Sequence, residues 1–163
     1  MFKICNASAG SGKTYTLVKE YLKATLSSEA YLPQRYVLAI TFTNKAVDEM
    51  KSRILETLIR FSNPKILKSK DSLFKDLAKE LKISSNELHL RAVKLIRRIL
   101  HNYGSFEVST IDKFNQKLIR TFAYDLGIPM NFEVELDTDF LLQQAVDGLI
   151  YKAGKVKALT KTL

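Results

Sequence analysis

The feature that most constrains this chain is a glycine-rich loop at residues 7–14, with the sequence Ala-Ser-Ala-Gly-Ser-Gly-Lys-Thr. It fits the P-loop pattern, in which a small residue is followed after four positions by Gly-Lys and then by Ser or Thr. Gly10 and Gly12 allow the backbone to take positive φ and to approach phosphates closely. The N–H groups of such a loop form an anion-binding nest at the start of a helix. The loop therefore predicts that the chain binds a nucleoside triphosphate.

Two residues of the loop carry side-chain chemistry. Lys13 places its charge on the β- and γ-phosphates, and the Thr14 hydroxyl is a ligand for Mg²⁺, so these two are the predicted catalytic residues. Tyr15 follows directly and either stacks on the nucleotide or packs inside the protein. The predicted nucleotide-binding set is Ser8, Ala9, Gly10, Ser11, Gly12, Lys13, Thr14 and Tyr15.

The apolar pattern around the loop predicts strands that alternate with helices. Strands are expected at residues 2–6, 36–40 and 106–110, and the continuous apolar run at 36–40 is typical of a buried parallel strand. Helices are expected at residues 13–26, 45–61, 71–82, 86–102, 112–124 and 137–153. The predicted fold class is α/β: a P-loop NTPase (RecA-like) parallel sheet core flanked by helices, with α-helical insertions, and incomplete in this chain.

Helical spacing also predicts which side chains are buried. The helix at 45–61 has an apolar stripe of Val47, Met50, Ile54 and Leu58. For the helix at 86–102 the expected stripe is Leu90, Val93, Ile96 and Leu100. Residues 84–87, Ser-Ser-Asn-Glu, have the spacing of a capping box at the start of that second helix.

The charge of the chain leaves two possibilities open. The formal net charge is +9, from 26 Lys and Arg against 17 Asp and Glu, and such a balance favours polyanionic partners. A lysine-rich composition without a nucleic-acid partner is an equally good explanation. A basic ridge on the helix at 86–102 has the same two explanations, a solvated face or contact with duplex DNA; it consists of Lys94, Arg97, Arg98 and His101.

Other features exclude whole classes of protein. No apolar run approaches the roughly 20 residues of a membrane span. The single cysteine, Cys5, excludes an internal disulfide framework. His89 and His101 have no neighbouring ligand residue, so no zinc-type site is expected. We therefore expect a cytoplasmic protein without a membrane partner.

Polar residues follow the strand expected at 36–40. Ligands of open α/β folds bind at the carboxyl edge of the sheet, where Thr41, Thr43 and Asn44 offer hydrogen-bonding groups. Phe42 offers a stacking face and Lys45 a positive charge, a combination that suits single-stranded nucleic acid. An ordinary helix N-cap with a buried phenylalanine explains the same residues.

Residues 41–54, Thr-Phe-Thr-Asn-Lys-Ala-x-x-Glu-Met-x-x-Arg-Ile, closely resemble the motif that follows the P-loop in UvrD/Rep-type superfamily 1 DNA helicases. The form of the P-loop and its place near residue 1 resemble the RecB/AddA-type helicase–nuclease branch. Residues 109–114, Ser-Thr-Ile-Asp-Lys-Phe, are similar to the family element Ser-Thr-hydrophobic-His-Ser-Phe, which touches the DNA backbone. Thr110 and Phe114 match that element. Asp112 stands where histidine is usual and is expected to be a helix N-cap.

The resemblance implies an enzyme that uses ATP and Mg²⁺ to move 3′→5′ along single-stranded DNA and to unwind the duplex ahead, in recombinational repair. Its partners would be single-stranded and duplex DNA, a second motor domain in the remainder of the same polypeptide, and a partner helicase–nuclease subunit. The DNA-binding residues would be Thr41, Phe42, Asn44, Lys45, Thr110 and Phe114. Residues 1–62 and 104–125 would form part of the first motor domain, residues 63–103 an α-helical insertion, and residues 126–163 the start of a helical subdomain.

One part of the expected chemistry is missing from the sequence. A Walker B strand should end in Asp-Glu, and the acids Glu135, Asp137 and Asp139 do not follow an apolar run. We therefore expect the isolated chain to bind ATP weakly and to hydrolyse it negligibly. Two alternatives remain open: another P-loop enzyme such as a small kinase, and a non-catalytic DNA-binding module that retains a P-loop.

Overall fold

A computed structural model of the chain describes residues 12–129, 131–133 and 138–152. The strand expected at 2–6, Cys5, and the loop residues Ser8, Ala9, Gly10 and Ser11 lie outside the described residues. The chain divides into two compact units, residues 1–115 and 116–163, which are described separately.

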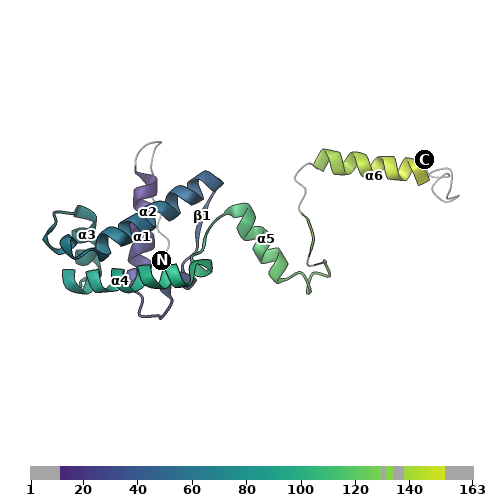
Figure 1. Cartoon of the computed structure of the whole chain (residues 1–163). Helices are drawn as coiled ribbons and strands as arrows, with labels where there is room; N and C mark the ends of the chain where they lie inside the picture. Colours follow the sequence, from purple (N-terminus) through teal and green to yellow (C-terminus); the bar gives the residue numbers. More distant parts are fainter. Residues whose placement is uncertain (1–11, 130, 134–137, 153–163) are drawn as a thin grey trace. The chain divides into compact units, whose positions relative to one another are not determined.

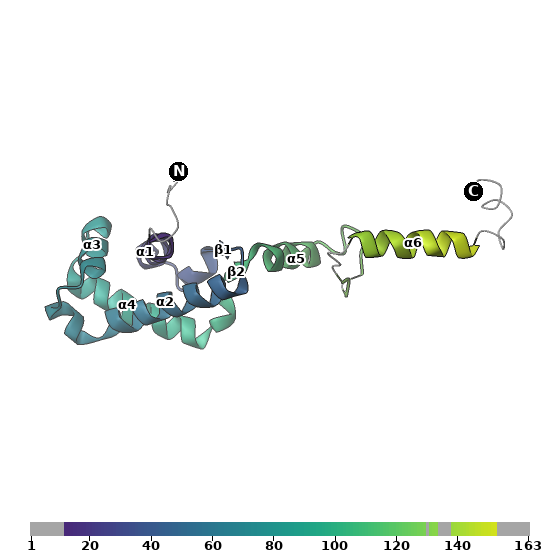
Figure 2. The same cartoon turned by 90° about the horizontal axis from the view of Figure 1, so that it is seen from above.

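The first unit contains most of the regular structure (Figures 1 and 2). Its helices are α1 (Lys13–Ser27), α2 (Asn44–Ser62), α3 (Ser72–Leu81) and α4 (Ser85–His101). Three short 3-10 helices connect them, η1 (Pro33–Tyr36), η2 (Pro64–Lys68) and η3 (Tyr103–Ser105). Its strands are β1 (Ala39–Thr41) and β2 (Val108–Thr110), and α5 (Ile111–Thr121) begins in this unit and ends in the second. The helices expected over these regions are confirmed.

The two strands form a small parallel sheet, in which Ala39 pairs with Val108 and Thr41 with Thr110. Parallel pairing is the arrangement expected of the α/β class, although the described part of the chain is mostly helical. The strand expected at 36–40 begins three residues late, because Pro33 starts the 3-10 helix η1, which continues to Tyr36. The expectation of continuous burial is wrong as well. Leu38 and Ile40 are 43% and 41% exposed.

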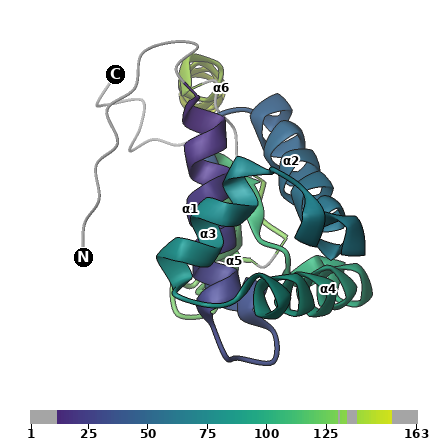
Figure 3. The ribbon, with the colours of Figure 1, turned by 90° about the vertical axis from the view of Figure 1, so that its left-hand side faces the viewer.

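The core of the first unit lies where α2 and α4 pack against each other and against α1 and α3 (Figure 3). The stripe predicted on α2, from Val47 to Leu58, is buried throughout. Phe61 extends it, and its ring meets the Phe74 ring of α3 edge-on, with 5.0 Å between the centroids. Apolar residues of α1 complete this core: Val18, Tyr21, Leu22 and Leu26.

Of the stripe predicted on α4, Ile96 is confirmed as buried and Val93 is half-buried, but the prediction is wrong for Leu90 and Leu100. Leu90 and Leu100 are 52% and 64% exposed, whereas the buried residues are Leu88, Ala92, Leu95, Ile96 and Ile99. Helix α4 carries apolar residues in two helical phases, and packing against α2 decides between them. The predicted cap at the start of α4 is confirmed, since the Ser84 hydroxyl accepts a hydrogen bond from the Glu87 N–H at 3.1 Å. The Glu87 carboxylate binds Arg91 at 2.7 Å.

The second unit comprises the end of α5, the turns that follow it, and α6 (Thr138–Lys152). Gly127 has a φ of 65°, and the Ile128 N–H donates to the Ala123 carbonyl at 3.0 Å, so the chain turns at this point. The Arg120 guanidinium lies over the Phe132 ring at 5.7 Å. No residue of α6 is buried. Among the described helices, none is long and apolar enough to cross a membrane.

Candidate nucleotide and DNA site at the strand ends

The described part of the P-loop begins at Gly12. This residue has a φ of 79° in the left-handed region, where any side chain would be strained, and its carbonyl accepts the Thr16 N–H at 2.9 Å. Lys13 and Thr14 therefore occupy the first turn of α1, where the backbone N–H groups have no partner within the helix. A glycine in this conformation directly before a helix fits a phosphate-binding loop.

Thr14 is half-buried and Tyr15 is 45% exposed. The Thr14 hydroxyl is the group that would hold Mg²⁺ beside the phosphates. Within residues 12–129, 131–133 and 138–152, no group of three or more His, Cys, Asp or Glu side chains could hold a metal ion.

Helix α1 lies against the strand that carries the second motif. Leu17, Glu20 and Tyr21 of α1 line a pocket of about 260 Å³ together with residues 37–40 and Met50. Figures 1 and 3 show α1 and α2 beginning at the same end of the first unit. Helix α2 follows the carboxyl end of β1, and α1 faces the strand through Leu17, Glu20 and Tyr21.

The turn between β1 and α2 is held by two threonines. The Thr43 hydroxyl accepts the Ala46 N–H at 3.2 Å and caps α2, while the Thr41 hydroxyl donates to the Thr43 carbonyl at 3.2 Å. Between them Phe42 is 85% exposed. Asn44 and Lys45, in the first turn of α2, are exposed as well. The N-cap is therefore real, but the expectation of a buried phenylalanine is wrong.

The turn between β2 and α5 has the same construction. The Thr110 hydroxyl accepts the Lys113 N–H at 3.2 Å, so Thr110 caps the helix, although it is only 5% exposed. The assignment of Asp112 as the N-cap is wrong. Asp112 lies in the first turn of α5, where a carboxylate stabilises the positive end of the helix dipole. Phe114 is half-buried one residue after Lys113.

The sheet brings the two turns together. Thr41 and Thr110 are register partners on neighbouring parallel strands, which lie about 4.8 Å apart in a sheet. Residues 41–45 and 110–114 therefore leave the same sheet edge side by side. Thr43, which was expected to offer a hydrogen-bonding group at this edge but was not in the predicted DNA-binding set, is the residue that caps α2.

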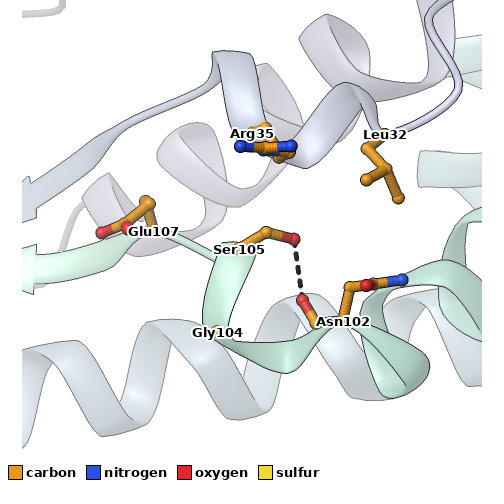
Figure 4. A pocket seen from close by; sticks show the side chains of 6 residues that line it. All are labelled: Leu32, Arg35, Asn102, Gly104, Ser105 and Glu107. Atoms are coloured by element: carbon orange, nitrogen blue, oxygen red, sulfur yellow. Dashed lines mark hydrogen bonds between the residues drawn. The ribbon is translucent and has the colours of Figure 1, made fainter.

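A further pocket in the first unit does not belong to this edge. Its volume is about 490 Å³, and it is lined by residues that precede the two strands: Leu32, Arg35, Asn102, Gly104, Ser105 and Glu107 (Figure 4). The Ser105 hydroxyl donates to the Asn102 carbonyl at 2.7 Å and accepts from the buried Gln34 amide at 3.1 Å. These bonds connect η1 to η3 at the amino ends of the strands.

Comparison with known proteins agrees with this arrangement. The chain matches the model of the UvrD/REP helicase N-terminal domain over residues 3–162. It belongs to the UvrD/REP helicase family. The match includes residues 63–103, so the family model also covers α3 and α4, although the motifs that resemble the family lie outside these two helices.

Relatives of this UvrD/REP family member are named as ATP-dependent helicase/nuclease subunits of the AddA type. The protein from Bacillus pumilus is 30% identical over 154 residues, which is 91% of this chain and 10% of the relative. The one from Lactobacillus acidophilus is 33% identical over 134 residues, or 82% of this chain and 9% of the relative. The one from Geobacillus thermodenitrificans is 31% identical over 146 residues, or 88% of this chain and 10% of the relative. The chain thus spans about one-tenth of the length of these relatives.

Proposed function

We propose that this chain is the ATP-binding portion of the first motor domain of an ATP-dependent DNA helicase. Lys13 would contact the β- and γ-phosphates of ATP, and Thr14 would hold Mg²⁺. Single-stranded DNA would lie along the sheet edge, where the residues proposed to bind it are Thr41, Phe42, Asn44, Lys45, Thr110 and Phe114. Family membership and the names of the relatives support this assignment.

The in-register pairing of Thr41 with Thr110 is the single observation that carries the proposal. It unites two helicase-like motifs that lie about 70 residues apart in the sequence at an edge where Phe42 is 85% exposed. A nucleobase can stack on an exposed aromatic ring, and backbone phosphates favour the positive ends of helices such as α2 and α5. Lys45 adds a charge in the first turn of α2.

The proposed domain division follows from the same assignment. Residues 1–62 and 104–125 form part of motor domain one, and residues 63–103 are a helical insertion whose helices pack into the first unit. Residues 126–163 begin a further helical subdomain. Unwinding of duplex DNA in repair, movement 3′→5′, and cooperation with a second motor domain and a partner helicase–nuclease subunit would belong to the whole protein.

The two alternatives are affected differently by the comparisons. A small kinase does not agree with a match to a helicase domain over residues 3–162. A DNA-binding module that does not turn over ATP stays compatible with the isolated chain, because the 163 residues contain no apolar strand that ends in Asp-Glu. We accordingly propose that the isolated chain binds ATP and hydrolyses it negligibly.

Nucleotide binding by the 163-residue chain tests the proposal. A fluorescent ATP analogue should bind in the presence of Mg²⁺, and Lys13→Ala should weaken binding by at least about tenfold, since a charge-assisted contact is worth roughly 1.5–3 kcal/mol. Lys75→Ala, on the exposed side of α3, is the matched control and should bind like the wild type. Equal affinities for wild type and Lys13→Ala would contradict the assignment. Robust turnover that Lys13→Ala abolishes would contradict the claim of negligible hydrolysis.

A further inference from the structure

A second basic site lies on α4, at the end of the first unit opposite the strand edge. It is a pocket of about 320 Å³, lined by Tyr31, Val93, Lys94, Arg97, Arg98, His101 and Asn102. Asn102 follows α4 and precedes η3, so the pocket lies on the side of the sheet where the strands begin. No residue of the P-loop or of the two strand-end turns contributes to it.

One cation of this pocket is held in place by the loop after α1. The Arg98 guanidinium lies over the Tyr31 ring at 4.7 Å and donates to the Ala30 carbonyl at 3.4 Å. These contacts hold the loop against α4 and fix one positive charge at the pocket wall. The guanidinium covers one face of the Tyr31 ring, and the Tyr31 side chain is still 75% exposed.

Two other cations of the pocket are free to bind a ligand. Lys94 and Arg97 are exposed, and neither forms an ion pair with a carboxylate of the described residues. Lys94 and Arg98 also line an adjoining pocket, which contains two acids: Glu87, which is bonded to Arg91, and Glu29, which is exposed. The pocket therefore has an excess of positive charge on one helix face.

The spacing of the charges indicates the ligand. Residues at positions 94, 97, 98 and 101 share one face of a helix and extend over about 10 Å along its axis. Successive phosphates of one DNA strand rise by about 3.4 Å along the duplex axis, so a row of this length is long enough to contact more than one phosphate. An open row of several charges on one helix face suits a chain of phosphates, such as the backbone of a duplex, better than a single small anion.

We propose that Lys94, Arg97 and Arg98, with Tyr31 as the support for Arg98, bind the phosphate backbone of duplex DNA. The choice of DNA over another polyanion rests on the proposed helicase function. The site would hold duplex on the first unit at a position separate from the strand edge, which would take single-stranded DNA.

The test compares two double variants of the 163-residue chain by fluorescence anisotropy with a labelled 20-base-pair duplex and a labelled single strand. Lys94→Gln/Arg97→Gln should reduce duplex affinity at least about tenfold at 0.1 M salt. The slope of log K against log salt should become less steep by about 1.8, because two phosphate contacts are lost. Single-strand affinity should stay the same. Arg98 is left intact because it holds the loop.

Lys75→Gln/Lys79→Gln on α3 is the control, since it removes the same charge from residues that do not line the pocket. Lys94→Arg/Arg97→Lys keeps the charge and should keep duplex binding. The inference would be overturned if the α3 control lost as much duplex affinity as Lys94→Gln/Arg97→Gln, or if Lys94→Gln/Arg97→Gln lost none. If poly-L-glutamate binds as tightly as the duplex, and Lys94→Gln/Arg97→Gln weakens both, the result would indicate an acidic protein partner. That outcome would also overturn the inference. Failure of single-strand binding alone would count against the proposed function and not against this site.

Discussion

Where α2 packs on α4, the side chains of Ile54, Leu58, Leu88 and Ile99 are all fully buried, whereas at the carboxyl edge of the sheet Phe42 is 85% exposed. The hydroxyls of Thr41 and Thr43, on either side of Phe42, form hydrogen bonds within the turn. The first region buries apolar surface and stabilises the fold. The second uses its hydrogen bonds to hold an aromatic ring in solvent. Substitutions in the first should change the free energy of unfolding, and substitutions in the second should change ligand binding.

The largest effect is expected inside the helical contact. Leu88→Ala should lower the free energy of unfolding by about 2–5 kcal/mol, because it opens a cavity in a packed core. Leu90→Ala, two residues along the same helix, should cost less than about 0.5 kcal/mol, because Leu90 is 52% exposed. Urea denaturation measures both. An equal loss of unfolding free energy in the two variants would contradict the assignment of Leu88 to the buried face of α4.

At the sheet edge, Phe42→Ala should weaken single-stranded DNA binding by about 1–3 kcal/mol, or roughly fivefold to 150-fold, since a stacked base is lost. Its free energy of unfolding should stay within about 0.5 kcal/mol of the wild type. Tyr36→Ala is the matched control, because Tyr36 is 79% exposed at the other end of the strand region. If Tyr36→Ala weakens binding as much, the contrast between the two regions is lost.

The helix-capping residues of the two regions should also differ in whether they affect DNA binding. Thr43→Ala should cost about 1 kcal/mol of stability, within a range of about 0.5–2, and so should Ser84→Ala, since each removes a side chain that accepts a backbone N–H. Only the Thr43 variant should also weaken single-stranded DNA binding, and Thr43→Ser should restore both properties. Loss of DNA binding in Ser84→Ala would refute the distinction.

The smallest effect concerns an ion-pair cluster on the surface of the helical region. Lys19 and Lys23 of α1 each contact the Glu80 carboxylate of α3 at 2.7 Å. Hydrogen bonds from Lys19 and then Lys23 lower the pKa of Glu80 from 4.5 to about 2. Glu80→Gln should cost less than about 1 kcal/mol at pH 7, because the pair is partly exposed.

The pH dependence of this cluster follows from the direction of the shift. The folded pKa of Glu80 lies below its unfolded value, so its contribution to stability is complete above about pH 4.5 and is lost as the pH falls towards about 2. The difference between wild type and Glu80→Gln in urea denaturation should therefore shrink from pH 5 to pH 3. A difference that grows over this range would contradict the assigned contact.

Local patterns in the sequence were sufficient to predict the buried stripe of α2, whose apolar residues follow a single helical phase from Val47 to Leu58. They did not predict most of the buried residues of α4, because the apolar residues of α4 follow two helical phases. Only packing against the neighbouring helices decides which phase is buried. Local patterns also misplaced β1, since Pro33 shortened the strand through η1. The error on α4 arises from interactions between elements, which periodicity along one element does not contain, whereas the error on β1 arises locally from Pro33.

The site shows the same limit. The motifs at 41–45 and 110–114 were visible separately, and family resemblance suggested their roles. Their juxtaposition depends on the register of Thr41 with Thr110, a long-range pairing. The exposure of Phe42 was equally undetermined, because a cap with a buried aromatic ring and a cap with an exposed one have the same sequence.

The central claim is that two distant motifs form one DNA-binding edge, and photocrosslinking tests it most directly. An octanucleotide with a single 5-iodouracil should be irradiated with the 163-residue chain, and the crosslinked peptides identified by mass spectrometry. We predict crosslinks to residues 41–45 and to residues 110–114, with both lost in Phe42→Ala. Crosslinks confined to one of these segments, or to the α4 pocket alone, would contradict the account.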